Sequence, residues 1–416
     1  MTIVKLIALF EGSASIAGIQ VGETCMAKIT PEIETAARIK VVGVGGSGGN
    51  AINHMINNKI RNVEFIAMNT DVQDLHKSLA EKKIHLGKNL TKGLGAGGNP
   101  DMGCRASEET KAEIQDAVKG ADMVFIACGM GGGTGTGGAA VIARAAKEQG
   151  ILTVAVVTKP FFFEGNQRMR IAERGIEELE SEVDAIIIIP NDRLLAIAGK
   201  DTTFKDAFAK CDEVLLQAVE GISELIASPG IINVDFADMK SVLTDAGTAL
   251  MGVGFASGDA RAEKAAIQAI NSPLLDISIN GAKGVLFAIA SNDDLTMAEF
   301  QDAAKVITES IDKDARVIIG TILDERIKKG EIKITVIATG FPSEGIKKGA
   351  LFNPNSRELF NRQDQAARKA EEDNGESKPF IKTPEPKDAD IADTDGIDED
   401  LDNFGAIPAF LRRNKK

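Results

Sequence analysis

Residues 129–138 read GMGGGTGTGG, a run of glycines interrupted only by one methionine and two threonines. The apolar residues 123–128 before this run are typical of a buried strand, and residues 139–149 after it carry apolar side chains at helical spacing. A strand, a glycine loop and a helix in this order point backbone N–H groups and a helix N-terminus at an anion. These flanking elements make a glycine-rich surface linker the weaker interpretation. The stretch therefore predicts a phosphate-binding loop.

The composition of this loop sets the expected chemistry. Glycine has no Cβ that would hold the backbone away from a phosphate, and Thr134 and Thr136 add hydroxyl donors. The loop contains no lysine, so it is not a Walker A sequence. We therefore expect amides, the helix dipole and a metal ion, whose protein ligands remain unknown at this stage, to neutralise the phosphate charge.

A second glycine motif follows an earlier predicted strand. Residues 38–44 read as a strand that runs into GVGGSGGN at 43–50, which matches the dinucleotide-binding pattern GxGxxG. Glu64 and Asp71 lie downstream, where a ribose-binding acid would stand. This pattern alone also suits a nicotinamide oxidoreductase, although the chain has no evident partner for hydride transfer. The oxidoreductase therefore stays open as an alternative.

Further loops follow predicted strands in the same way. The strand 63–68 ends in Asn69-Thr70-Asp71, and another glycine loop occupies residues 93–100. In doubly wound α/β sheets ligands bind at the carboxyl ends of the strands. These loops are therefore expected to converge on one site.

Seven short motifs taken together identify a family. They are GVGGSGGN (43–50), AMNTD (67–71), GAGGNP (95–100), GMGGGTGTGG (129–138), PFFFEGNQR (160–168), NDRLL (191–195) and GIINVDFAD (230–238). Together they resemble the tubulin/FtsZ family of GTPases over about residues 38–341, and the resemblance returns at the C-terminus. The third motif reads GAGGN where the family usually has GAGAN, and the extra glycine would loosen that loop.

The resemblance implies a GTPase that binds GTP or GDP with Mg²⁺, and it assigns roles to residues of this chain. The implied phosphate-binding residues are Gly45, Gly46, Ser47, Asn69, Asp71, Gly97, Gly98, Asn99, Gly131, Gly132, Gly133, Thr134, Gly135 and Thr136, of which Gly97, Gly98 and Asn99 would lie near the γ-phosphate. The implied ribose contacts are Glu164 and Arg168, and the implied guanine pocket consists of Asn50, Asn191, Phe208 and Asp212. The residues implied to polarise the attacking water are Asn233, Asp235 and Asp238.

Elementary chemistry supports part of this assignment. Phe208 and Asp212 are four residues apart on a predicted helix, so a ring and a carboxylate share one face. A carboxylate accepts hydrogen bonds from guanine N1–H and the 2-amino group, whereas adenine offers neither donor on that edge. Phe208 is equally well placed to be a core residue, and Asp235 and Asp238 could simply be helix caps.

The chain length of 416 residues allows two domains. We expect an α/β fold, namely a Rossmann-like GTPase domain with a parallel sheet, a long central helix and a second, smaller α/β domain. The expected boundaries are an N-terminal extension at 1–36, a GTP-binding domain at 37–203, the central helix at 204–229, an activation and polymerisation domain at 230–345, an acidic linker at 362–402 and a C-terminal peptide at 403–416.

Composition excludes several function classes. The formal charge of −13 disfavours nonspecific binding to nucleic acid, so no nucleic-acid partner is expected. No apolar run reaches the roughly 18 residues of a membrane span, so direct membrane insertion is not expected. The four cysteines show no metal-binding spacing, which fits reduced thiols in a cytoplasm.

The C-terminal region changes character twice. Residues 362–402 hold 14 acidic and 6 basic residues with few apolar ones, which predicts a disordered linker. Phe404, Ile407 and Leu411 would then align on one helical face and are followed by basic residues. Such a patch beyond a linker is typical of a docking peptide, and residues 404–413 resemble the family's peptide for a membrane-tethering division protein.

The predicted function is that of a GTPase that polymerises head-to-tail into filaments forming the cell-division ring, in the cytoplasm under the membrane. A tubulin-like filament outside division, such as one that positions DNA, is the alternative, and the terminal peptide argues against it. From Asp212 to Ala227 the central helix spans fifteen residues, or roughly 22 Å, so the carboxylates beyond it are expected to act on a neighbouring subunit's nucleotide. Residues 1–25 have no counterpart in the family and are expected to be dispensable.

Overall fold

The computed structural model describes residues 37–197, 203–227, 230–272, 279 and 281–341. All of these residues belong to one compact unit, Met1–Phe352. The predicted N-terminal extension, acidic linker and C-terminal peptide lie outside the described residues, so the structure says nothing about them.

Ten strands form one sheet in the order β3-β2-β1-β4-β5-β6-β7-β10-β8-β9. The first six run parallel to one another, and they are β1 (Ile39–Val44), β2 (Val63–Asn69), β3 (Lys82–His85), β4 (Met123–Gly129), β5 (Leu152–Lys159) and β6 (Ala185–Pro190). The order 3-2-1-4-5-6 is that of the doubly wound dinucleotide-binding fold, so the predicted Rossmann-like parallel sheet is confirmed.

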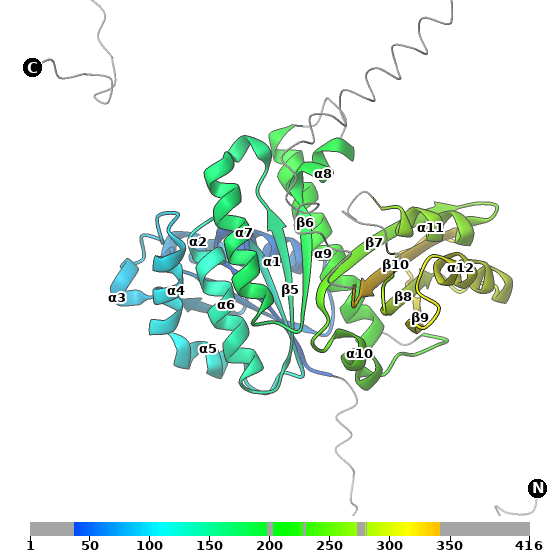
Figure 1. Ribbon diagram of the computed structural model, residues 1–416, viewed down its shortest axis with the longest axis horizontal. Helices are drawn as coiled ribbons and strands as arrows, with labels where there is room; N and C mark the ends of the chain where they lie inside the picture. Colours follow the sequence, from blue (N-terminus) through cyan, green and yellow to red (C-terminus); the bar gives the residue numbers. More distant parts are fainter. Residues whose placement is uncertain (1–36, 198–202, 228–229, 273–278, 280, 342–416) are drawn as a thin grey trace, which may run out of the picture. The chain divides into compact units, whose positions relative to one another are not determined.

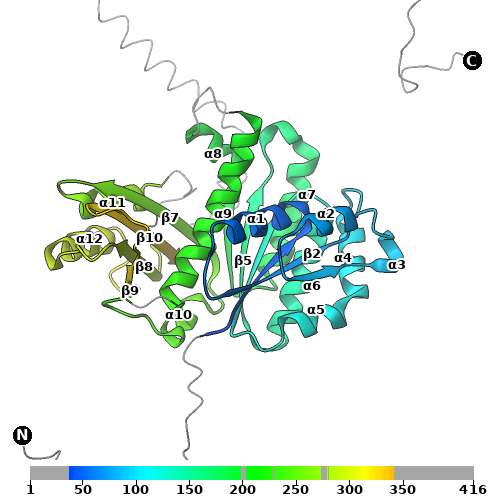
Figure 2. The same ribbon diagram turned by 180° about the vertical axis from the view of Figure 1, so that it is seen from behind.

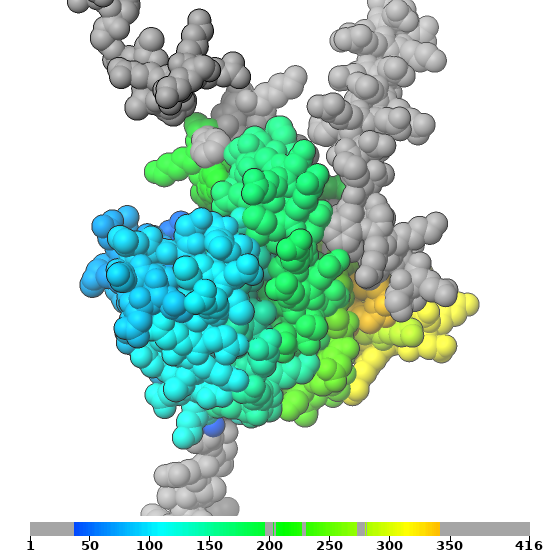
Figure 3. Space-filling view, turned by 60° about the vertical axis from the view of Figure 1, so that its left-hand side comes forward, coloured from blue at the N-terminus to red at the C-terminus, as the bar shows by residue number. Residues whose placement is uncertain are grey.

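Helices cover both faces of this parallel part. One face carries α4 (Pro100–Glu109), α5 (Lys111–Val118), α6 (Thr134–Lys147) and α7 (Asn166–Glu180), which are in front in Figure 1. The other face carries α1 (Gly45–Asn57) and α9 (Phe204–Ala227), which are in front in Figure 2. Successive strand residues alternate between the two cores, as Val41 and Val42 do. In Figure 3 the outer layer appears as a cyan segment that includes α4 and α5 beside the green segment that includes α7.

Short elements complete the parallel part of the fold. They are α2 (Val72–Lys77), α3 (Lys88–Thr91), the 3₁₀ turn η1 (Phe162–Glu164) and α8 (Asn191–Ile197). Within the described residues, no helix combines the length and apolar character that crossing a bilayer requires.

The second α/β part continues the same sheet. It contains β7 (Gly247–Ser257), β8 (Gly284–Ser291), β9 (Arg316–Leu323) and β10 (Glu331–Thr339), together with α10 (Phe236–Leu243), α11 (Arg261–Ile270) and α12 (Met297–Glu309). Here β10 pairs antiparallel with both β7 and β8, while β8 and β9 are parallel. The link to the first part is short, because β6 and β7 pair over only three residue pairs, from Ala185↔Gly247 to Ile187↔Ala249.

The helix after the glycine run begins earlier than the sequence predicts. We expected it from Ala139, but α6 starts at Thr134 and includes the second half of the glycine motif. Helix α6 packs closely against α4, and position 137 must be glycine because a Cβ there would lie 1.9 Å from the carbonyl oxygen of Pro100. Part of the glycine run therefore permits contact between helices and does not serve phosphate approach.

The central helix, expected at 204–229, is α9, which spans Phe204–Ala227 in the described residues. The Asp206 N–H donates to Thr203 Oγ1 at 3.2 Å, which caps the N-terminus of the helix. Cys211, Leu215 and Ile222 are buried along one face of the helix, whereas Phe208 is 41% exposed. Phe208 is therefore not a core residue, and that interpretation is excluded.

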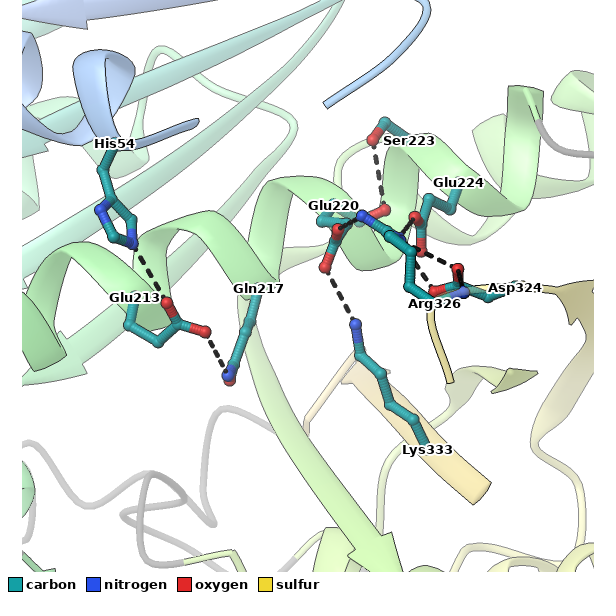
Figure 4. A network of polar contacts seen from close by, with 9 residues as sticks. All are labelled: His54, Glu213, Gln217, Glu220, Ser223, Glu224, Asp324, Arg326 and Lys333. Carbon is teal, nitrogen blue, oxygen red and sulfur yellow. Dashed lines mark hydrogen bonds and ion pairs between the residues drawn. The ribbon is translucent and has the colours of Figure 1, made fainter. Parts of the chain in front are cut away.

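Polar contacts hold α9 along its length, as Figure 4 shows. Towards its start, Glu213 contacts His54 of α1 at 3.1 Å. Towards its end, Glu220 contacts Arg326 at 2.9 Å and Lys333 of β10 at 3.0 Å, and Arg326 also pairs with Glu224. The helix is thus tied to both parts of the sheet.

Candidate functional site

A cavity of about 260 Å³ lies at the carboxyl ends of β1, β4 and β5. The pairing of Val44 with Cys128 places the two glycine motifs side by side at this edge. The cavity is lined by these residues of the predicted site: Gly45, Gly46, Ser47, Gly132, Gly133, Thr134, Gly135, Glu164, Arg168, Asn191, Phe208 and Asp212. Residues from four of the seven motifs and from α9 thus converge on one cavity.

Two helix N-termini meet at one end of this cavity. Helix α1 begins at Gly45 and α6 begins at Thr134, and both residues line the cavity. Each N-terminus presents unpaired N–H groups and a partial positive charge, so the pair suits an anion such as a polyphosphate. A Cβ on Gly132 would meet no atom of the described residues within 4 Å, so the space beside its Cα is open.

The two threonines of the loop have different surroundings. Thr134 lines the cavity and its Oγ1 lies 2.6 Å from Thr70 Oγ1. Thr136 is buried, and its Oγ1 accepts a hydrogen bond from the Gly131 N–H at 2.9 Å. The structure therefore places Thr136 and Gly131 outside the cavity lining, where they fix the loop from behind.

The predicted ribose residues form a pair on one wall. Arg168 contacts Glu164 at 2.8 Å, and the other oxygen of Glu164 accepts the Phe161 N–H at 2.8 Å. The Arg168 stem packs against Gly131, where a Cβ would lie 2.8 Å from Arg168 Cγ. The guanidinium is thereby held over the glycine loop with half of its side chain exposed.

The opposite end of the cavity suits a planar base. Phe208 contacts the buried ring of Phe161 edge to face, with centroids 5.2 Å apart. Asn191 is buried, and its Oδ1 has no hydrogen-bond partner among the described residues. Burial raises the pKa of Asp212 to about 6, and the charge of His54 opposes this rise. Two acceptors with unmet demand therefore line this end, and a base that offers N–H donors would satisfy them.

Other predicted nucleotide residues stand around this cavity rather than in its lining. The Asn69 side chain donates to Asp74 Oδ2 at 2.8 Å, and Asp71 caps α2 by accepting the Gln73 N–H at 2.8 Å. Asn50 is exposed on α1. Asn69 and Asp71 thus organise the start of α2.

The predicted γ-phosphate loop borders the cavity through its backbone. Gly97 and Gly98 are exposed with φ values of +61° and +73°. Asn99 caps α4 by accepting the Asp101 N–H at 3.0 Å. A Cβ on Gly133 would lie 2.9 Å from the Asn99 nitrogen, so this loop packs directly against a residue of the cavity wall.

The predicted catalytic residues lie beyond the far end of α9. Asn233 Oδ1 accepts the Gly230 N–H at 2.7 Å, and Asp235 caps α10 by accepting the Asp238 N–H at 2.7 Å. All three side chains are exposed, and Asp238 lies 3.7 Å from Arg316. None of them lines the cavity, so one described chain does not bring the two halves of the predicted site together.

Sequence reasoning missed several lining residues. They are Val44, Gly129, Met130, Thr158, Pro160 and Cys211. Thr158 and Pro160 lie at the end of β5, and the rule that ligands bind at strand carboxyl ends could have found them. Cys211 gives no such signal, and burial raises the pKa of its thiol to about 12, so it is an unreactive wall residue.

Comparisons with known proteins agree with this geometry. Residues 38–199 match the Tubulin/FtsZ family, GTPase domain, and residues 247–342 match the FtsZ family, C-terminal domain. The structure is similar to an empty FtsZ dimer from M. jannaschii, with 44% sequence identity, a TM-score of 0.71 and coverage of 74% of this chain and 89% of that chain. A substituted FtsZ from M. jannaschii gives the same identity, TM-score and coverage of this chain, with 92% of that chain covered.

A more distant structure supports the fold alone. CetZ2 from Haloferax volcanii, in a GTPγS-bound protofilament, shares 22% identity with a TM-score of 0.64, covering 80% of this chain and 99% of that chain. The GTPase-domain match also decides against the oxidoreductase alternative. The chain therefore belongs to the FtsZ family of tubulin-like GTPases, and it binds GTP or GDP and hydrolyses GTP.

Proposed function

We propose that this GTPase assembles head-to-tail into filaments that form the cell-division ring. GTP is bound by the glycine loops of one subunit and hydrolysed with Asn233, Asp235 and Asp238 of the next. The carrying observation is the separation of these side chains from the cavity by the length of α9, roughly 22 Å from Asp212 to Ala227 at about 1.5 Å per residue. Positioning a water needs contacts of about 3 Å, so the halves must come from two chains.

The loop that carries these side chains is built to meet another subunit. It is anchored on β9, because the Ile232 N–H donates to Thr321 Oγ1 at 2.8 Å and the Thr321 N–H donates back to Ile232 at 3.0 Å. Ile231 beside it is 82% exposed. A contact between this rigid loop and the cavity mouth of a second copy joins unlike surfaces, which produces an open filament.

The chain's own groups have distinct roles in this proposal. The amides at the starts of α1 and α6 bind the phosphates, while Asn191 and Asp212 accept the guanine donors and Phe208 stacks on the base. Mg²⁺ keeps several waters and binds phosphate oxygens, so the Ser47 and Thr134 hydroxyls at the phosphate end fit it. When bound it neutralises phosphate charge, and Asp235 and Asp238 of the neighbour orient the attacking water.

Asp235 offers a clean test because its two candidate roles can be separated. Asn caps helices as well as Asp does, so Asp235→Asn keeps the cap of α10 and removes the charge. We expect this variant to melt as the parent does and to lose most GTP turnover. Turnover at the parental rate would reduce Asp235 to a cap and overturn the shared site.

Mixing two inactive variants tests the division of labour between subunits. Gly132→Asp places a carboxylate in open space beside the phosphates, so it should fold but bind no nucleotide. We expect Asp235→Asn and Gly132→Asp to be nearly inactive alone and to recover turnover when mixed, at junctions of an intact pocket with an intact loop. A mixture that stays inactive while copolymerising would contradict the proposal.

The same function assigns a role to the C-terminal region, which lies outside the described residues. Residues 404–413 bind a membrane-tethering division protein, and the acidic stretch 362–402 is a spacer with an r.m.s. reach of roughly 35 Å. This places the filament in the cytoplasm at the division site. Truncation after Asp402 should abolish capture by tether-bearing membranes and leave GTP-dependent sedimentation intact. Loss of sedimentation as well would assign the peptide to the filament itself.

A further inference from the structure

A second hollow lies at the opposite edge of the sheet from the nucleotide cavity. It has a volume of about 760 Å³ and opens where β1 and β2 begin, at Ile39 and Val63. It shares no lining residue with the nucleotide cavity. The proposed filament chemistry therefore gives this hollow no role.

The floor of this groove is apolar and preformed. Ile56, Ile60, Val63 and Phe65 line it, are only partly buried and pack against the main core cluster. Leu79 completes the floor with 52% of its surface exposed, and its N–H donates to Asn53 Oδ1 at 2.7 Å. These five side chains form an apolar strip between the charged residues that also line the groove, and covering the strip would remove apolar surface from water.

The chain itself delivers a segment to this groove. Ala37, the first described residue, lines it, and the Arg38 N–H donates to Asp122 Oδ2 at 2.8 Å, which fixes where the chain enters. Thirty-six residues precede this point. The nearest of them have the highest effective concentration at the groove, and eleven extended residues reach as far as roughly 36 Å.

The sequence of that nearest segment matches the groove. Residues 26–36 read MAKITPEIETA, in which Ile29 and Ile33 are four positions apart and the charges have both signs. The groove edge also carries both signs, with the exposed basic residues Arg38 and Lys119 and the exposed acidic residues Glu64 and Glu81. Two branched apolar side chains therefore have a floor of matching chemistry within reach.

We propose that residues 26–36 fold back over this groove, with Ile29 and Ile33 seated on the floor formed by Ile56, Ile60, Val63, Phe65 and Leu79. The segment then acts as an internal cover for the amino-terminal edge of the sheet. Residues 1–25 lie beyond it and take no part. The N-terminal extension is thus divided into a packed part and a dispensable part.

The composition of the chain permits a direct optical test. The protein contains no Trp and no Tyr, so an introduced indole is the only strong emitter. In the full chain, Ile33→Trp should emit at shorter wavelength and be quenched several-fold less by acrylamide than Ile19→Trp, which is the matched probe in residues 1–25. Equal quenching of the two probes would overturn the proposal.

A change in the groove should release the segment. Leu79→Asp, added to Ile33→Trp, should shift the emission to longer wavelength and raise quenching to the level of Ile19→Trp. Met297→Asp is the matched control, because Met297 is 68% exposed on α12 and is not part of the groove. Release by both substitutions, or by neither, would contradict seating on this floor.

Deletions and dilution distinguish residues 26–36 from a second copy of the chain as the occupant of the groove. Removing residues 1–25 should leave the melting temperature and GTP turnover unchanged, whereas removing 1–36 should lower the melting temperature. If the short-wavelength emission of Ile33→Trp disappears on dilution in GDP, the groove is filled by a second copy and the intramolecular cover is wrong. Emission that is independent of concentration supports it.

Discussion

The two ends of α9 carry buried or partly buried carboxylates in opposite situations. Asp212, near the start, faces the nucleotide cavity and has only His54 among cations to oppose the rise in its pKa. Near the end, Glu220 and Glu224 are held by Arg326 and Lys333. At the first end the carboxylate of Asp212 is available to accept hydrogen bonds from a ligand. At the second end Glu220 and Glu224 are paired with cations of the same chain. One helix thus serves recognition at one end and attachment at the other.

The attachment end nevertheless carries an imbalance. Three carboxylates, those of Glu220, Glu224 and Asp324, surround two cations. The cluster therefore has a net charge of −1 when all five groups are ionised. Burial and then the charge of Glu220 raise the pKa of Glu224 to about 7, against the opposing Lys333 and Arg326. This end is therefore locked most tightly when Glu224 holds a proton.

Removing the shared cation should have the largest effect on stability. Arg326→Ala leaves three mostly buried carboxylates with Lys333 alone. We expect a loss of about 3 kcal/mol in the free energy of unfolding, the low end for a broken buried ion pair because Arg326 itself is half exposed. Urea unfolding measures it. Lys329→Ala, which breaks the exposed pair with Asp293, should change stability by less than about 1 kcal/mol, and equal losses would erase the contrast.

At the recognition end the effect should appear in binding. Asp212→Asn replaces an acceptor by a donor facing the guanine donors, so GTP affinity should fall by about 1–3 kcal/mol while urea unfolding changes little. In the parent, affinity should also fall below about pH 6, as the carboxyl takes up a proton. Glu213→Gln, on the side that contacts His54, is the control and should bind GTP as the parent does. A stability loss without an affinity loss would reverse the assigned roles of the two ends.

Per pH unit, the smallest effect is the change of stability with pH at the attachment end. Between the ordinary value of 4.5 and about 7 the folded state holds the Glu224 proton more tightly than the unfolded state, so this group's contribution to stability falls as pH rises and is constant above 7. Glu224→Gln mimics the protonated form. It should match the parent near pH 4.5 and then gain on it by at most about 1.4 kcal/mol per pH unit up to pH 7. Urea unfolding at pH 5, 6, 7 and 8 checks this. A variant whose free energy of unfolding falls relative to that of the parent as pH rises contradicts it.

Much of the fold could be predicted from local pattern. The strands at 38–44, 63–68 and 123–128 are largely apolar runs that end in turn signals, and the structure confirms them as β1, β2 and β4. The start of α9 could be predicted because Thr203 and Asp206 form a cap within three residues. Such features are local, so their causes are visible in the sequence.

The site was less predictable because the same residue type occurs in two different structural roles. Gly132 faces open space whereas Gly137 admits α4, and both needs read as glycine. Thr134 and Thr136 are likewise two residues apart, yet one faces the cavity and the other fixes the loop. Only the start of α6 and its packing against α4 separate these roles, and both depend on contacts distant in sequence.

The three-pair ladder between β6 and β7 has a mechanical consequence. If subunits pull on one another, tension crosses each chain from the β1–β6 side to the β7–β10 side. Few hydrogen bonds join β6 to β7 and resist this tension. The helix α9, which is attached to α1 and to the segment β9–β10, therefore carries most of the force between the two parts. Strain then concentrates at the seam beside Ala185 and Gly247, and the seam rather than either sheet half is where a stretched subunit yields first.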